Sequence, residues 1–235
     1  MSGPNYTETR IARTSLVGCL GAACLLSIAC AAGRPIHYYT VDPPPAANVD
    51  AKPQGLVLLV GRFAAAPDLQ DGRIRYRTGD NEVGAYEYHR WTEPPGVMVR
   101  DLLIGALRGT GKYRQVQETS SAAAGDYLVR GKLDDFSEID GPGILARVSL
   151  HLELVDKKNG LVVWDHHYQH DQPVDGKTMK EVVAALDRNL QSVIAEAATG
   201  IGGFLSSRSQ AGYRSVAPRW DSIEYLLRVG TASAV

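Results

Sequence analysis

The sequence predicts an α+β domain, a two-layer sandwich with a largely antiparallel sheet and two main helices packed on one of its faces. Three observations support this fold. A strand and a hairpin pattern precede the first helical pattern, a three-stranded meander follows it, and a long amphipathic helical pattern comes last. Because strands and helices come in blocks, the order favours helices gathered on one face of the sheet.

The sheet pattern begins with the continuous apolar run 56–60, which suits a strand buried on both faces. Two β-prone runs, 73–77 and 83–91, flank a Gly-Asp-Asn turn signal and predict a hairpin. Upstream, 36–41 is also β-prone. We expect this last segment to pair at an edge of the sheet.

The first helix is predicted to begin at Pro95, because proline suits the first turn, and to end near Gly109 and Gly111. Gly109 and Gly111 also suggest a phosphate-binding loop, but they follow a helix and lack the serine or threonine of that motif. A helix C-cap is therefore the better interpretation. The second helix is predicted over about 178–204 from an apolar stripe at helical spacing: Val182, Leu186, Leu190, Val193, Ala197 and Ile201.

Between the helices, a short strand is predicted at 113–116, followed by three long strands at 127–136, 144–155 and 161–169. Asn159-Gly160 is a strong hairpin signal between the last two. In the middle strand apolar and polar residues alternate strictly. One face of the meander should therefore be buried and the other polar.

Residues 1–29 have the features of a secretory leader: a polar start, an apolar run from Leu16 to Ile28, and small residues before Cys30. The three cysteines, Cys19, Cys24 and Cys30, all lie within the first thirty residues. We expect Cys30 to carry the lipid anchor of a lipoprotein. The exported part then has no pair of cysteines for an internal disulfide.

Two alternatives to this interpretation stay open. Residues 16–19 match a lipobox more closely than residues 27–30, which begin with Ser27, but almost no apolar run precedes Cys19. The apolar run could also remain as an uncleaved membrane helix, although about fifteen residues are available against the ~20 that a span needs.

Four segments are therefore expected: a lipoprotein signal peptide at 1–29, a lipidated, proline-containing tether at 30–54, a globular domain at 55–206, and a C-terminal tail at 207–235. In the tail, a polar linker is predicted to precede a short amphipathic helix, because Trp220, Ile223 and Leu227 fall at helical spacing. Without the leader the formal net charge is −2. That charge argues against a nucleic-acid partner.

No catalytic, metal or cofactor site is predicted. The histidine cluster at 166–170 invites a metal interpretation, but on a strand His166 and His170 lie about 13 Å apart and His167 points to the opposite face. No cysteine follows position 30, and no serine stands out as a nucleophile. A small periplasmic hydrolase is thus a weaker interpretation than a protein that binds partners.

The segment 86–95 differs from the histidine cluster and the serines, because it is dense in aromatic residues and ends in a rigid Pro-Pro turn. Its alternation places Tyr86 and Arg90 on one face of a strand and His89 and Trp91 on the other. The aromatics could simply fill the core. Since Trp and Arg often anchor interfaces, we also expect the segment to form or support a partner-binding surface. The residues predicted for that role are Tyr88, His89, Arg90, Trp91, Pro94 and Pro95.

The sequence resembles the ABC-type transport auxiliary lipoprotein family, the group that includes paraquat-inducible protein C. The resemblance rests on the leader ending in Cys30, on Tyr-Tyr-Thr-Val-Asp-Pro at 38–43, on Val-Gly-Arg-Phe at 60–63, on Arg-Ile-Arg-Tyr-Arg at 73–77, and above all on Tyr-His-Arg-Trp-Thr-Glu-Pro-Pro at 88–95. It spans roughly 30–204. Ser27 at the first lipobox position departs from the usual pattern.

Membership would imply a non-enzymatic envelope lipoprotein, anchored through acyl chains such as palmitate, that works with an ABC transporter permease and ATPase and with a mammalian-cell-entry (MCE) protein in lipid transport. Its expected role is to dock the MCE partner at the outer membrane. Ala31 after Cys30 favours the outer membrane, because lipoproteins with Asp at that position stay in the inner membrane. The alternative is an envelope-assembly or peptidoglycan-synthase-regulating lipoprotein, and a homo-oligomer remains open.

Overall fold

The computed structural model describes residues 34–43, 55–79, 81–119 and 124–216, and of 210–216 only the backbone. The chain divides into two units, Met1–His37 and Tyr38–Val235. Only 34–37 of the first unit are described, so the following account concerns the second unit. The predicted leader, Cys30 and the tail segment 217–235 lie outside the described residues.

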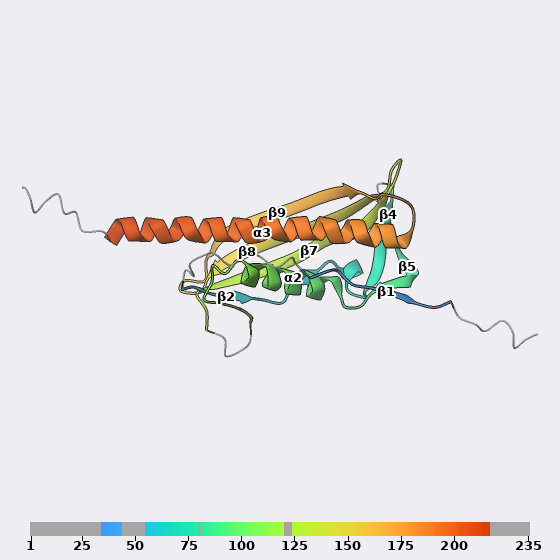
Figure 1. Ribbon diagram of the computed structural model, residues 1–235. Helices are drawn as coiled ribbons and strands as arrows, with labels where there is room; N and C mark the ends of the chain where they lie inside the picture. Colours follow the sequence, from blue (N-terminus) through green and yellow to red (C-terminus); the bar gives the residue numbers. More distant parts are fainter. Residues whose placement is uncertain (1–33, 44–54, 80, 120–123, 217–235) are drawn as a thin grey trace, which may run out of the picture. The chain divides into compact units, whose positions relative to one another are not determined.

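Strands and helices follow one another in the predicted order, and all but His37, the first residue of β1, belong to the second unit (Figure 1). The two α-helices are α2 (Pro95–Gly109) and α3 (Met179–Val216), and a short 3-10 helix, η2, covers Pro67–Leu69. The strands are β1 (His37–Tyr39), β2 (Val57–Val60), β3 (Ala64–Ala65), β4 (Arg73–Thr78), β5 (Glu82–Trp91), β6 (Gln115–Glu118), β7 (Tyr127–Asp140), β8 (Leu145–Asp156) and β9 (Val162–Pro173). The predicted α+β class with two main helices is confirmed.

The long strand β7 organises a curled, mixed sheet. Its neighbour β8 pairs with it in antiparallel register over most of its length, and β9 continues this meander. On its other side β7 pairs in parallel with β2, β3 and β4, while β4 and β5 form the predicted antiparallel hairpin. The antiparallel meander and hairpin form most of the sheet, and β1 and β6 stand at the ends of the strand order.

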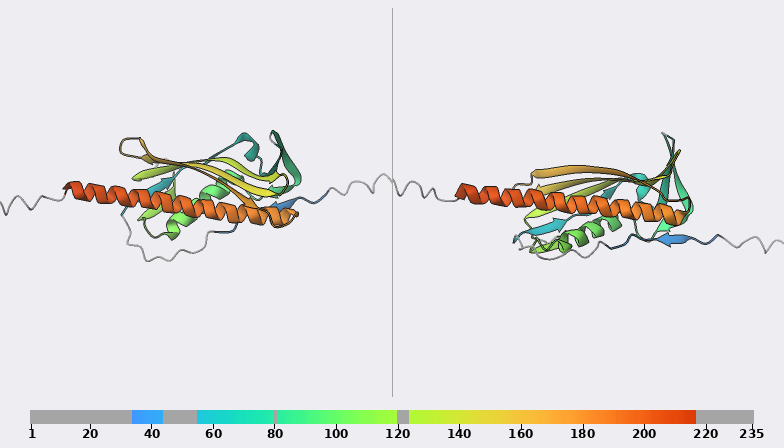
Figure 2. Two further views of the ribbon diagram at one scale, coloured as in Figure 1. Left: turned by 90° about the horizontal axis from the view of Figure 1, so that it is seen from above. Right: turned by 45° about the horizontal axis from the view of Figure 1, so that its top comes forward.

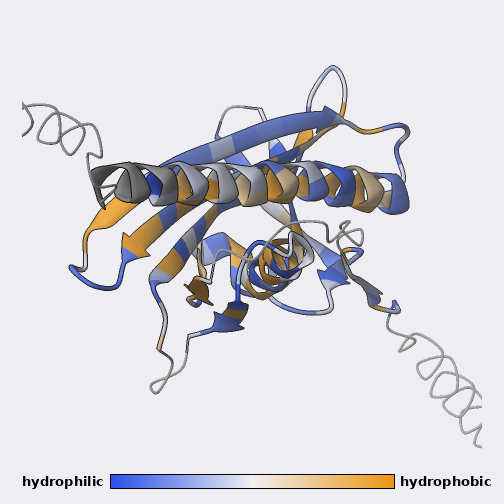
Figure 3. Ribbon diagram, turned by 60° about the vertical axis from the view of Figure 1, so that its left-hand side comes forward, coloured by the Kyte–Doolittle hydropathy of each residue, from blue (hydrophilic) through white to orange (hydrophobic). Residues whose placement is uncertain are grey.

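Both helices lie on the same side of the sheet and contact each other (Figures 1 and 2). α2 packs on β6, β7 and β3, and α3 packs on β8, β9 and β7. Polar and apolar residues alternate along the strands and around the helices (Figure 3), so the apolar sides meet in one core. Leu103, Leu133, Leu150, Leu186 and Leu190 are among its fully buried side chains. At ~25 cal/mol per Å² of apolar surface removed from water, this packing is the main stabilising contribution.

The predicted helix cap and turns are confirmed. Gly111 follows Thr110, the C-cap residue of α2, and has φ +62°; its N–H donates to the Arg108 carbonyl at 3.1 Å. Gly160 has φ +73° in the β8–β9 turn. Both positions need the left-handed backbone that glycine adopts without strain.

Several boundaries differ from the prediction. β7 ends at Asp140 and β9 at Pro173, where their ends were predicted at 136 and 169. β6 begins at Gln115 rather than at 113, because the chain bends at Tyr113 and Arg114 and the Tyr113 side chain is buried in the core. α3 continues to Val216, past the boundary predicted at 206 and through most of the predicted linker, because serines and arginines at its end do not stop a helix. Among the described residues, no helix combines the length and the apolarity that a membrane span requires.

Candidate interaction surface

Two segments that contain aromatic residues, 38–39 and 86–91, meet at one end of the sheet. The Thr92 N–H donates to the Tyr39 carbonyl at 2.8 Å, and the Tyr39 hydroxyl and His89 Nδ1 share a hydrogen bond of 3.0 Å. The rings of Tyr39 and His89 also lie 5.7 Å apart. The predicted pairing of 36–41 at a sheet edge is thus confirmed, since β1 is the terminal strand beside β5.

The six residues predicted to bind a partner occupy different depths in this region. Trp91 is 3% exposed and stacks on Phe136 with ring centroids 4.9 Å apart, and Pro95 is buried at the start of α2. These two side chains support the surface from the core. The other four reach the surface: Pro94 is exposed, and Tyr88, His89 and Arg90 are half-buried.

The predicted alternation of faces along β5 is wrong for Tyr86 and His89. Arg90 lies opposite Arg73 and Ala85 lies opposite Arg75, so β5 accommodates extra residues at this point. Such a bulge breaks the period of two. As a result, the Tyr86 and His89 rings meet edge to face at 5.9 Å. Strict alternation had placed them on opposite faces.

A buried acid, Glu138, lies next to the contacting rings of Tyr86 and His89. The Tyr86 hydroxyl donates to the Glu138 carboxylate at 2.9 Å, and the Tyr76 ring packs 5.0 Å from that of Tyr86. Burial raises the pKa of Glu138, and the hydrogen bond from Tyr86 opposes that rise. Burial and Glu138 together raise the pKa of Tyr86.

A cavity of about 260 Å³ lies where the N-terminal segment passes α2. Polar and apolar side chains of the N-terminal segment, of the turn before α2 and of α2 itself line it: Thr40, Val41, Pro43, Glu93, Met98, Asp101 and Leu102. Glu93 is exposed and belongs to the predicted partner-binding segment. This end of the domain therefore offers a small hollow with two exposed carboxylates, Glu93 and Asp101, among its lining residues.

The N-terminal segment is also tied to α3. The Asp42 N–H donates to Asp187 Oδ1 at 3.1 Å, and Gln191 Nε2 donates to the Asp42 carbonyl at 2.7 Å. Burial raises the pKa of Asp187. The segment that would lead to the membrane anchor is thus fixed to both β5 and α3.

The histidines of β9 alternate as predicted. His167 shares a 3.0 Å hydrogen bond with Ser149 on the polar outer face, whereas His170 Nε2 lies 3.3 Å from Glu196 of α3. His166 packs between Trp164 and Tyr168 on the helix side. Among the described residues, no group of three or more His, Cys, Asp or Glu side chains is arranged to hold a metal ion.

The same contacts test a hydrolase interpretation. Ser149, His167 and Asp134 resemble a Ser-His-Asp set in composition. A catalytic triad needs the serine at one imidazole nitrogen and the carboxylate at the other. Here Ser149 Oγ and Asp134 Oδ2 both approach Nε2 of His167, at 3.0 and 3.9 Å. The arrangement therefore cannot relay a proton as a triad does.

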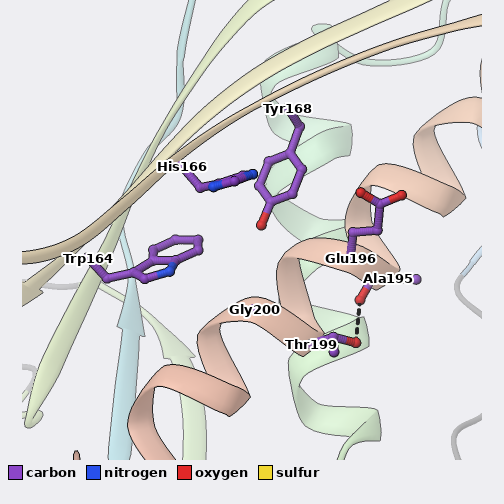
Figure 4. A pocket seen from close by; sticks show the side chains of 7 residues that line it. All are labelled: Trp164, His166, Tyr168, Ala195, Glu196, Thr199 and Gly200. Carbon is purple, nitrogen blue, oxygen red and sulfur yellow. Dashed lines mark hydrogen bonds between the residues drawn. The ribbon is translucent and has the colours of Figure 1, made fainter.

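A hollow of about 610 Å³ lies between β9 and α3 (Figure 4). We call it the aromatic groove. Trp164, His166 and Tyr168 form its sheet wall, and Ala195, Glu196, Thr199 and Gly200 form its helix wall. A Cβ on Gly200 would lie 3.2 Å from the Tyr168 hydroxyl and 3.3 Å from Trp164, so glycine lets the aromatic side chains approach the helix. Burial and Glu196 raise the pKa of Tyr168.

The aromatic groove was not predicted from the sequence. Its sheet wall was readable as aromatic residues at every second position of β9. The helix wall comes some thirty residues later, and nothing in the pattern of α3 indicates that Gly200 faces Trp164.

Comparisons with known proteins identify the fold. A crystal structure of a Xanthomonas campestris protein is 22% identical, with a TM-score of 0.66, over 73% of this chain and 99% of that chain. A second crystal structure, of an uncharacterized protein, is 16% identical, with a TM-score of 0.58, over 72% of this chain and 99% of that one. At these identities the likeness concerns the fold alone. No curated protein matches the sequence.

The comparison with protein families identifies the family as well as the fold. The family described as "ABC-type transport auxiliary lipoprotein component" matches residues 39–198. That stretch runs from the Tyr39 contact with β5 to the part of α3 that covers β8 and β9. Since the match covers well over half of the sequence, the chain belongs to the ABC-type transport auxiliary lipoprotein family.

Proposed function

We propose that the protein is a lipid-anchored, non-enzymatic auxiliary subunit of an ABC transport system that moves lipids, and that it docks the MCE-domain partner at the outer membrane. The family match over 39–198 is the observation that carries this proposal. The failure of the Ser149, His167 and Asp134 arrangement as a triad supports the non-enzymatic part.

Membrane attachment at Cys30 would hold one end of the domain close to the bilayer. Only 31–38 separate Cys30 from Tyr39, and so short a stretch spans at most ~30 Å when fully extended. Tyr39 in turn contacts His89 of β5. The surface formed by Tyr88, His89, Arg90 and Pro94, and supported by Trp91 and Pro95, would then lie just above the membrane. This is where the MCE partner would dock.

Affinity purification of the lipidated protein from detergent-solubilised envelopes tests this function. We expect an MCE-domain protein and an ABC permease to co-purify, and Arg90→Ala to reduce their recovery. Arg130→Ala is the matched control, because Arg130 lies on β7 and pairs with Glu153 at 2.7 Å on an exposed surface. Recovery of peptidoglycan synthases without transport proteins would instead support the envelope-assembly alternative.

A further inference from the structure

β9 has a free edge. Within the described part of the chain it pairs only with β8, along most of Val162–Pro173. A free edge presents a row of backbone N–H and C=O groups that recognise another extended chain. Natural edges are usually protected by lysines, prolines or bulges. β9 contains no Lys or Arg, and its one proline, Pro173, is its last residue. Its pairing with β8 shifts register only at its start, between Val162 and Trp164, so the rest of the edge is regular.

The aromatic groove runs beside this edge, on the side of α3 (Figure 4). Successive side chains of a strand point to opposite faces. A strand added to β9 would therefore direct every second side chain toward Trp164, Tyr168 and Gly200. The surface therefore suits an extended segment with apolar residues at alternate positions. Binding of such a segment to a sheet edge is known as β-strand addition.

The C-terminal tail contains such a segment. Ile223, Tyr225, Leu227 and Val229 alternate with Glu224, Leu226 and Arg228. β-branched and aromatic residues suit a strand. At ~3.3 Å per residue, 223–229 would cover about 20 Å of β9. These residues lie outside the described part of the chain, and the same sequence also allows the short helix expected above.

The tail of the same molecule is poorly placed for this edge. α3 runs antiparallel to β9, because Asn189 contacts the His170 carbonyl, Gly200 lies near Trp164, and Arg208 reaches Asp156 before β9 begins. A tail returning along β9 would thus run parallel to it. In Figure 1, with α3 in front, β8 lies below β9, so the new strand would be added above it and the crossover through α3 would be left-handed. About 98% of such crossovers are right-handed.

We infer that residues 223–229 of a second copy of this chain add as a strand to the free edge of β9, with Ile223, Tyr225, Leu227 and Val229 in the aromatic groove. A tail from another molecule has no crossover to complete, so either strand direction is open to it. The contact goes beyond the transport role, and it needs no protein other than this one.

Disulfide trapping between two differently labelled copies of the full-length lipoprotein tests the inference. One copy carries Tyr225→Cys and the other carries His166→Cys, an exposed position of the groove wall. We expect a crosslink between the two copies. Leu226→Cys is the matched control, because a strand would turn this position away from the groove, and it should crosslink to the His166→Cys copy at least tenfold more slowly.

Three outcomes overturn the inference. Equal crosslinking from positions 225 and 226 would contradict a strand, and no crosslinking from either would exclude the groove as the tail's site. A protein with both Tyr225→Cys and His166→Cys that crosslinks only within single chains would show docking in the same molecule. Light scattering on the unlabelled chain gives an independent readout: Tyr225→Asp should weaken self-association by about tenfold or more, and Leu226→Asp should not, where tenfold corresponds to ~1.4 kcal/mol.

Discussion

The Tyr39 hydroxyl and His89 Nδ1 are hydrogen-bonded at 3.0 Å although 50 positions separate them in the sequence. The bond joins the N-terminal strand to the segment that most strongly carries the family resemblance. It also fixes the point at which the chain arriving from the proposed membrane anchor enters the sheet. Removing this bond and measuring the stability of the domain therefore tests how strongly the N-terminal strand is held to β5.

Tyr39→Phe should lower the free energy of unfolding by about 0.5–1.5 kcal/mol, since it removes one partly buried hydrogen bond and keeps the ring. Urea unfolding followed by circular dichroism measures the change. Tyr38→Phe is the control, because Tyr38 is 61% exposed. Equal effects of the two substitutions would show that the contact with His89 adds nothing.

Asn189→Leu should destabilise the domain by about 1–3 kcal/mol, because it removes both hydrogen bonds of a buried side chain at nearly constant volume. The Asn189 side-chain amide donates to the Ala146 carbonyl at 2.8 Å and to the His170 carbonyl at 2.9 Å, and so joins α3 to both β8 and β9. Thermal unfolding reports the loss, with exposed Ser192→Ala as the control. An unchanged melting temperature would contradict this role for Asn189.

Glu138→Gln should stabilise the protein at neutral pH. Burial raises the pKa of Glu138 above its ordinary value of 4.5, so the folded state holds the proton more tightly than the unfolded state does. Ionisation therefore costs stability, and this cost grows as the pH rises from the ordinary value through the raised one. The gain from Glu138→Gln should be present at pH 7.5 and vanish below about pH 4.

Paired denaturation curves at the two pH values measure this difference. Glu87→Gln, on the exposed side of β5, should show no such pH dependence. A constant difference between Glu138→Gln and the parent protein across the range would remove the buried acid as its cause.

Much of the fold could be predicted because its signals are local. Pro95, the apolar stripe after it and the glycines that follow define α2, and Asn159-Gly160 defines the β8–β9 turn. The end of α3 could not be read in the same way, because the polar residues after Phe204 are compatible with a helix as well as with a linker. Local pattern fixes where an element starts more reliably than how far it runs.

The candidate surface was only partly predictable for a related reason. The segment 88–95 was recognisable from its composition, but burial of Trp91 on Phe136 and the approach of Tyr86 to His89 depend on the bulge in β5 and on distant strands. The aromatic groove depends on Gly200, far from Trp164 in sequence. Sequence periodicity does not predict contacts between residues that are so far apart in the chain.

Cys30→Ser should release the protein from the membrane fraction. Each acyl methylene buried in the bilayer contributes ~0.8 kcal/mol, far more in total than surface charge could supply in a domain of charge −2. Fractionation of cell envelopes followed by immunoblotting measures the release, and separation of the two membranes tests the proposed outer-membrane location. If Cys19→Ser releases the protein and Cys30→Ser does not, Cys19 is the lipidated residue.

Site-specific photo-crosslinking from position 93 in living cells tests the central claim most directly. Glu93 is exposed, lines the cavity beside α2 and belongs to the proposed docking segment, so a photoreactive residue there can report a partner without disturbing the core. Asn159, exposed in the β8–β9 turn, is the control position. The account predicts a crosslink to an MCE-domain protein from position 93 and none from position 159. A crosslink from position 93 only to cell-wall enzymes would contradict it.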